Sequence, residues 1–156
     1  MRRFERHAAP RSGDHKRRRS TGQALVEFAI VVPLFILLLA AMVDFGMGLY
    51  SYMTIITAAR EGGRLGITAC GAGPCSAIVK ARAAAASGGM VGASDVMLSC
   101  YAAADTTFSA PYNCDAATVS YGDSVKVTVS YTYHMIWPLA FGNALPLSSA
   151  ITMVVE

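Results

Sequence analysis

Gly22-Gln-Ala-Leu-Val-Glu27-Phe-Ala-Ile-Val-Val-Pro33-Leu-Phe-Ile-Leu-Leu-Leu-Ala-Ala-Met-Val43 is the longest apolar run of the chain, and the other segments are interpreted outward from it. A helix needs roughly 20 apolar residues to cross a bilayer, which is about the length of this run. Its only charged residue, Glu27, lies near the start, where a charge costs less than at mid-bilayer. The run therefore predicts a transmembrane helix over 23–44 with a functional carboxylate near one end.

Residues 1–22 form a basic leader in front of this run. The basic residues of the leader are Arg2, Arg3, Arg6, Arg11, Lys16, Arg17, Arg18 and Arg19. The next basic residue is Arg60, so the positive-inside rule predicts a cytoplasmic N-terminus and an extracytoplasmic C-terminal part. We expect Met1–Ser20 to be disordered, because it is charged and poor in apolar residues. Nucleic-acid binding is not expected, since no aromatic or Gly-rich recognition element accompanies the basic residues.

Two other membrane topologies remain open at this point. A secretory signal peptide has the same order of a basic segment followed by an apolar core. That core is typically about 7 to 15 residues long, shorter than the run here, and the Glu27 carboxylate is unfavourable within it. The small-residue site at Leu39-Ala40-Ala41 is a mediocre cleavage site. The other topology is an uncleaved single-pass anchor.

Residues 45–66 are predicted to extend the helix beyond the membrane. Leu49, Met53 and Ile56 recur at the three-to-four spacing of one helix face. We expect the helix to end at Gly62-Gly63, because consecutive glycines favour termination. Pro33 lies inside the membrane run, where a proline kink is tolerated.

Three motifs along this helix resemble those of TadE-like proteins, minor pilins or pseudopilins of the tight adherence (Tad/Flp) pilus system. They are Gly22-Gln-Ala-Leu-Val-Glu-Phe-Ala, Val43-Asp44-Phe45-Gly46 and Ala58-Ala59-Arg60-Glu61-Gly62-Gly63-Arg64. The resemblance covers about Gly22–Leu65, and the rest of the chain is similar only in layout. It implies a pilin-like fold and a role in assembling adhesive pili.

The resemblance also implies a processing site and a set of partners. A prepilin peptidase would cut between Gly22 and Gln23, and Glu27 would neutralise the new amino terminus of a neighbouring subunit. Other Tad pilus subunits, an inner-membrane assembly platform and the lipid bilayer are the implied partners. The implied location is the bacterial cytoplasmic membrane, with incorporation into a surface pilus left open. The family signature on the helix comprises Asp44, Gly46, Arg60, Glu61, Gly62 and Arg64.

All four cysteines follow the apolar run, which suits an oxidising compartment outside the cytoplasm. Cys70 and Cys75 can close a small loop, and Cys100 and Cys114 then pair by default. The sequence alone leaves three connectivities open. The Cys70–Cys75 spacing encloses Gly and Pro and has no nearby His, so a loop disulfide is favoured over a metal site.

Residues 67–156 are predicted to form a small extracytoplasmic α+β domain with a sheet of three to four antiparallel strands. Cys75–Ser87 is Ala-rich and predicts a short helix that stops at Gly88-Gly89. Ser124–Met135 alternates between apolar and polar residues, which predicts a half-buried strand. The other expected strands are Asp95–Tyr101, Leu147–Glu156 and Ala117–Tyr121, the last forming a hairpin across Gly122-Asp123. Trp137, Pro138 and Phe141 are expected either to cover the sheet edge or to form a surface anchor.

Catalytic and metal-binding patterns do not stand out in the sequence, so we expect a protein without enzymatic activity, cofactor or metal. His7 and His15 fall in the leader, and His134 is expected on the solvent face of a strand. The aspartates are expected at element boundaries or in loops: Asp44, Asp95, Asp105, Asp115 and Asp123. The leading hypothesis is a minor pilin or pilus-assembly component. The alternatives are a membrane-anchored binding domain without a pilus role and a secreted effector or inhibitor.

Overall fold

The computed structural model describes residues 15–116, 118–137 and 142–155, and side chains from residue 22 onward. The elements are α1 (His15–Ala69), α2 (Ser76–Ala86), a short 3-10 helix η1 (Ala93–Asp95), β1 (Val96–Tyr101), β2 (Ser124–His134) and β3 (Ala144–Val154). The chain divides into two compact units, Met1–Met42 and Val43–Glu156, and α1 contributes to both. The predicted α+β class, with a long N-terminal helix, a short helix and an antiparallel sheet, is confirmed.

Helix α1 is longer at both ends than the sequence suggested. It begins at His15, so the expectation of disorder up to Ser20 is wrong for the last residues of the leader, and residues 1–14 lie outside the described residues. It passes through Pro33 without ending. It also continues to Ala69 instead of ending at Gly62-Gly63. Within the described residues, α1 from Gly22 onward is the one helix long and apolar enough to cross a membrane.

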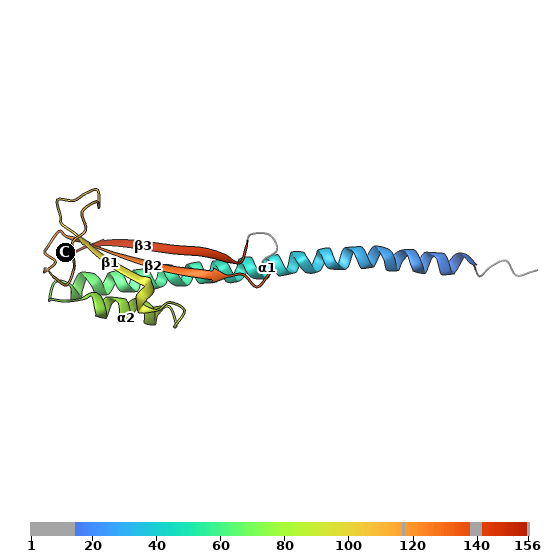
Figure 1. The fold of residues 1–156 in the computed structure, drawn as a ribbon, viewed down its shortest axis with the longest axis horizontal. Coiled ribbons are helices and arrows are strands. Elements are labelled where there is room, and N and C mark those ends of the chain that lie inside the picture. The colour runs from blue at the N-terminus through green and yellow to red at the C-terminus, as the bar shows by residue number, and fades with distance from the viewer. Residues whose placement is uncertain (1–14, 117, 138–141, 156) are drawn as a thin grey trace, which may run out of the picture. The chain divides into compact units, whose positions relative to one another are not determined.

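The sheet has three antiparallel strands in the order β1-β2-β3 (Figure 1). The central strand β2 has the predicted alternation, with Val125, Val127, Val129 and Tyr133 buried and the intervening residues more exposed. β3 pairs with β2 over its whole length, from Ser124 opposite Val154 to His134 opposite Ala144. The exposed position of His134 agrees with the sequence prediction.

The inner face of the sheet packs against the second half of α1 through small residues on the helix (Figure 1). Gly62 and Gly66 are so close to the sheet that a Cβ on them would lie 3.2 Å from Val127 Cγ1 and 2.9 Å from Val125 Cγ1. A Cβ on Gly62 would also lie 3.1 Å from Ala83 Cβ of α2. The glycines therefore allow close packing rather than end the helix, since burial of the sheet and α2 offsets their low helix propensity.

Thr118–Tyr121 is not a strand, so the predicted hairpin with β2 is wrong, and Ala117 lies outside the described residues. Val119 is buried and donates its backbone N–H to the Cys70 carbonyl. Tyr121 is 84% exposed and does not join the sheet. The turn before β2 instead contacts the residue that follows β3: the Gly122 N–H donates a hydrogen bond to the Val155 carbonyl at 2.8 Å.

Candidate functional site

The predicted processing residues lie on the exposed part of α1 in the first unit. Gly22 and Gln23 are inside the helix, and no atom lies within 4 Å of a Cβ built on Gly22. The Gln23 Nε2 donates a hydrogen bond to Glu27 Oε1, one turn later, at 3.2 Å. Among the described residues nothing packs against the Gly22–Gln23 bond, which is helical, so a peptidase that cut here would first have to unwind it locally. A glycine there lowers the cost of unwinding by about 1 kcal/mol relative to alanine.

Large apolar side chains remain exposed along α1 far beyond the predicted membrane run. In the first unit they include Leu25, Phe28, Ile30, Leu34, Phe35, Leu38 and Met42. In the second unit Phe45 is 74% exposed and Met53 is 58% exposed, with Leu49 and Tyr50 also exposed between them. Contiguous apolar surface of this kind marks a membrane or protein interaction site.

Asp44, expected at an element boundary, lies inside α1 and holds the connection between β2 and β3. Its Oδ1 accepts the Ile136 N–H at 2.9 Å and its Oδ2 accepts the Trp137 N–H at 2.9 Å. The Tyr133 hydroxyl donates to Asp44 Oδ1 at 3.3 Å. Burial raises the pKa of Tyr133, and the nearby Asp44 carboxylate adds to this effect. A carboxylate that accepts three hydrogen bonds fixes the start of this connection to the helix.

The signature residues that follow Asp44 separate into buried and exposed groups. Gly62 is part of the contact with the sheet and α2, whereas Gly46 meets nothing within 4 Å. Arg60 and Arg64 are exposed. Glu61 pairs with Arg82 of α2 at 3.0 Å. This pair is exposed to solvent, so it stabilises the fold by at most about 1 kcal/mol.

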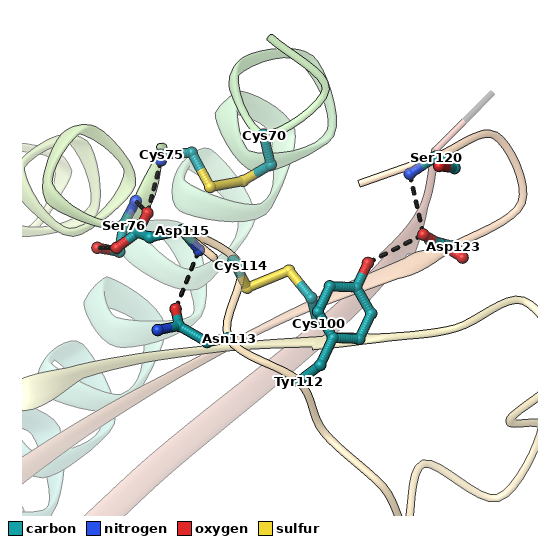
Figure 2. Close-up of a disulfide and its surroundings, with 10 residues drawn as sticks. All are labelled: Cys70, Cys75, Ser76, Cys100, Tyr112, Asn113, Cys114, Asp115, Ser120 and Asp123. Atoms are coloured by element: carbon teal, nitrogen blue, oxygen red, sulfur yellow. Dashed lines mark hydrogen bonds between the residues drawn. A yellow bond between two sulfur atoms is a disulfide. The ribbon is translucent and has the colours of Figure 1, made fainter. Parts of the chain in front are cut away.

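The cysteines form two disulfides, Cys70–Cys75 and Cys100–Cys114 (Figure 2). The pairing is one of the three connectivities that the sequence left open, and none of the four cysteines is free. Cys70, Cys75 and Cys100 are fully buried, and Cys114 nearly so. Both bonds therefore belong to the core of the second unit.

Asp115 connects these two disulfides by capping the start of α2 (Figure 2). Its Oδ1 accepts the Cys75 N–H at 2.7 Å and the Ser76 N–H at 2.8 Å, and its Oδ2 accepts the Ser76 hydroxyl. These bonds, the one from the Ser76 hydroxyl foremost, lower the pKa of Asp115. A carboxylate at a helix N-terminus is also favoured by the helix dipole.

Asp123 organises the turn before β2 in a similar way (Figure 2). Its carboxylate accepts the Tyr112 hydroxyl, the Ser120 N–H and the Ala103 N–H, each at 2.9 Å. These contacts, first of all the Ser120 N–H, lower the pKa of Asp123. Desolvation, together with the Asp123 carboxylate, raises the pKa of Tyr112 to about 12. This network explains why Thr118–Tyr121 turns instead of extending as a strand.

These aspartates fit structural roles in which a carboxylate accepts backbone N–H groups. Among the residues that the structure describes, no three His, Cys, Asp or Glu side chains gather as a metal site. Sequence reasoning missed the contact between Asp44 and the β2–β3 connection. Its partners lie about ninety positions away in the sequence, so no local pattern indicated it.

A comparison with protein families supports the resemblance suggested by the motifs. Residues 22–64 match the family model described as TadE-like protein. The match covers the apolar run and the helix up to Arg64, and it stops before α2 and the sheet. Comparisons with curated proteins and with solved structures give no match. The TadE-like character predicted from the sequence is therefore confirmed over this segment.

Proposed function

Taking residues 22–64 as a TadE-like segment, we propose that the protein is a non-enzymatic, pilin-like component that takes part in assembling a Tad pilus. It is anchored in the bacterial cytoplasmic membrane by α1, with its second unit outside the cytoplasm. The observation that carries the proposal is the exposed apolar surface of α1, which is longer than a bilayer requires.

The length of this surface can be compared with the thickness of the membrane. A bilayer core covers roughly 20 residues of a helix. If the span begins at Gln23, these residues end just before Asp44. The exposed Leu49, Tyr50 and Met53 lie on α1 beyond that point, in water unless another protein covers them. A monomeric anchor has no need for apolar side chains there, whereas helices that pack together in an assembly do. The surface therefore supports contact with other pilus components.

The start of the helix supports processing by a prepilin peptidase. Removal of residues 1–22 would leave Gln23 as a cationic amino terminus at the membrane boundary. Glu27 is exposed on the same helix, and its carboxylate accepts a hydrogen bond from the neutral side-chain amide of Gln23. In a low-dielectric environment a carboxylate attracts a neighbouring subunit's amino terminus strongly. We infer that Glu27 pairs with that terminus during assembly.

Sequencing the mature N-terminus of the protein recovered from cells tests the processing step. Gln23 as the first residue is the expected result. A protein that still begins at Met1 or its neighbour indicates an uncleaved anchor, and one that begins near Met42 indicates release by a signal peptidase. Either result overturns the proposal and favours a membrane-anchored binding domain or a secreted protein, respectively.

A photo-crosslinking residue at Met53 tests the assembly step. We expect it to crosslink to a pilus component in cells that express the pilus genes. A matched crosslinker at Tyr121, which is also exposed but lies in the turn before β2, serves as the control for random collision. Crosslinks at Met53 no more frequent than at Tyr121 would contradict the proposed packing. Glu27→Gln is expected to be processed but to crosslink less; normal crosslinking in this variant refutes the pairing of Glu27.

A further inference from the structure

The strand β2 runs back along α1 toward Val43, where the second unit begins. Its start is near Gly66, where a Cβ would meet Val125, and its end is near Gly48, where a Cβ would lie 3.8 Å from the Tyr133 ring. Eight residues of strand cover about 26 Å. The eighteen residues from Gly48 to Gly66 cover about 27 Å of helix. The two lengths agree, so β2 runs alongside α1 over this distance, in the direction of Asp44.

The connection after β2 consequently lies against Asp44, near the start of the second unit. Asp44 is the first charged residue after the apolar run, and its carboxylate accepts the backbone N–H groups of Ile136 and Trp137. The Met135 N–H donates to the Asn143 carbonyl at 3.1 Å, which closes the connection. Ile136 and Trp137 are thereby held at the level of α1 where the membrane is expected to end.

The side chains held there are apolar, and the part of the chain that the structure describes leaves them exposed. Ile136 is 59% exposed and Trp137 is 50% exposed, and Phe45 on the helix is exposed at the same level. Trp is the side chain most characteristic of the membrane–water interface, where its apolar ring and its N–H donor are both accommodated. Asp44 bonds the backbone and not the side chains of this pair, so the side chains are free to contact lipid.

We propose that Ile136 and Trp137 lie in the interfacial layer of the bilayer and form a membrane contact of the second unit. This contact sets the height and rotation of the second unit relative to the membrane. The inference rests on the membrane anchoring proposed above but not on any role in a pilus. Its occupant is the lipid interface, because Asp44, which holds the pair, directly follows the apolar run in the sequence and the adjacent Phe45 is exposed.

Trp137 is the only tryptophan of the chain, so intrinsic fluorescence of the full-length protein in lipid vesicles reports this position directly. The vesicles contain phosphatidylcholine and phosphatidylglycerol with bromine atoms placed at a shallow or a deep acyl position. We expect a larger loss of Trp137 emission with shallow bromines than with deep ones, and protection from aqueous acrylamide. Asp44→Ala should release the connection and reduce the quenching by lipid.

Two reporter variants in a Trp137→Phe background provide matched controls. Tyr121→Trp marks the turn before β2 and should remain open to acrylamide and unquenched by lipid. Phe35→Trp marks the apolar run and should be quenched most by deep bromines. If Phe35→Trp is not quenched, the membrane span itself is refuted together with the proposed function.

Two results overturn the inference alone while Phe35→Trp is quenched as expected. The first is Trp137 emission that is unquenched by lipid and open to acrylamide, which places Trp137 in water. The second is protection from acrylamide that requires a high protein-to-lipid ratio, which assigns the surface to a second copy of the chain. Reduced lipid quenching in Asp44→Ala supports the inference that Asp44 holds Trp137 at the interface, and unchanged quenching overturns that part of it.

Discussion

Replacing Gly66 by alanine tests the close packing of α1 against the sheet. The new Cβ would lie 2.9 Å from Val125 Cγ1, whereas carbon atoms pack favourably at about 3.5 to 4.0 Å. Val125 is fully buried on the central strand and has little freedom to move. Overpacking of this kind costs about 1 to 3 kcal/mol. The higher helix propensity of alanine relative to glycine offsets up to about 1 kcal/mol of this cost. We expect a net loss of about 0 to 3 kcal/mol of unfolding free energy.

Two other glycines of the same helix serve as controls for this substitution. Gly46→Ala meets nothing within 4 Å, so only the propensity gain of up to about 1 kcal/mol applies. Gly63→Ala meets the flexible Met153 side chain at 3.3 Å and should fall between the other two variants. Because the propensity change is common to all three, the difference between Gly66→Ala and Gly46→Ala isolates the overpacking of about 1 to 3 kcal/mol.

Urea unfolding of the full-length variants in detergent micelles, followed by circular dichroism and by Trp137 fluorescence, measures these differences. The midpoint should fall in the order Gly46→Ala, Gly63→Ala, Gly66→Ala. Equal midpoints for Gly66→Ala and Gly46→Ala would refute the reasoning. They would show that α1 does not pack against β2 at this distance.

Three further predictions concern the second unit. The double variant C100A/C114A opens a loop of about 15 residues and should lose about 3 kcal/mol in denaturant unfolding; an unchanged midpoint contradicts the structural role of this disulfide. The lowered pKa of Asp115 means that its stabilisation is present above the ordinary value near 3.8 and is lost as the pH falls through the folded pKa. Asp115→Asn should therefore unfold with a weaker acid dependence than the unmodified chain, and identical acid profiles refute the cap. The pKa of Tyr112 is raised from 10.0 to about 12, so its contribution is complete below pH 10 and is lost as the pH rises through about 12. Tyr112→Phe should flatten the loss of stability over that alkaline range, and an unchanged loss argues against the bond to Asp123.

The regular elements of the second unit were predictable because their patterns are local. The strict alternation from Val125 to Tyr133 identifies both the strand and its buried face. The Ala-rich helix and its stop at Gly88-Gly89 follow from propensity and from the left-handed backbone of Gly88, whose φ is +65°. The TadE-like motifs could also be recognised from the sequence, since they lie on one continuous helix.

The remaining features depend on partners that are distant in the sequence. A pair of glycines such as Gly62-Gly63 favours the end of a helix in solvent, but it allows close packing where the helix is covered. Here the covering sheet comes from residues about sixty positions later, so the local sequence does not decide between the two. Val119 suggested a strand, yet its N–H bonds to Cys70 and the following turn is organised by Asp123. The candidate site was predicted only in part: Glu27 and the processing residues come from local motifs, whereas the hydrogen bonds of Asp44 do not.

The contact between Gly63 and Met153 has a consequence for how the protein is made. The ribosome produces the outer half of α1 well before its covering strand β3, so α2, β1 and β2 are all made before the two surfaces can meet. Contacts of such long range form slowly and leave apolar surface exposed in the meantime. The exposed apolar face of the nascent helix therefore has to be covered by a chaperone or by other components of the assembly until β3 has been made.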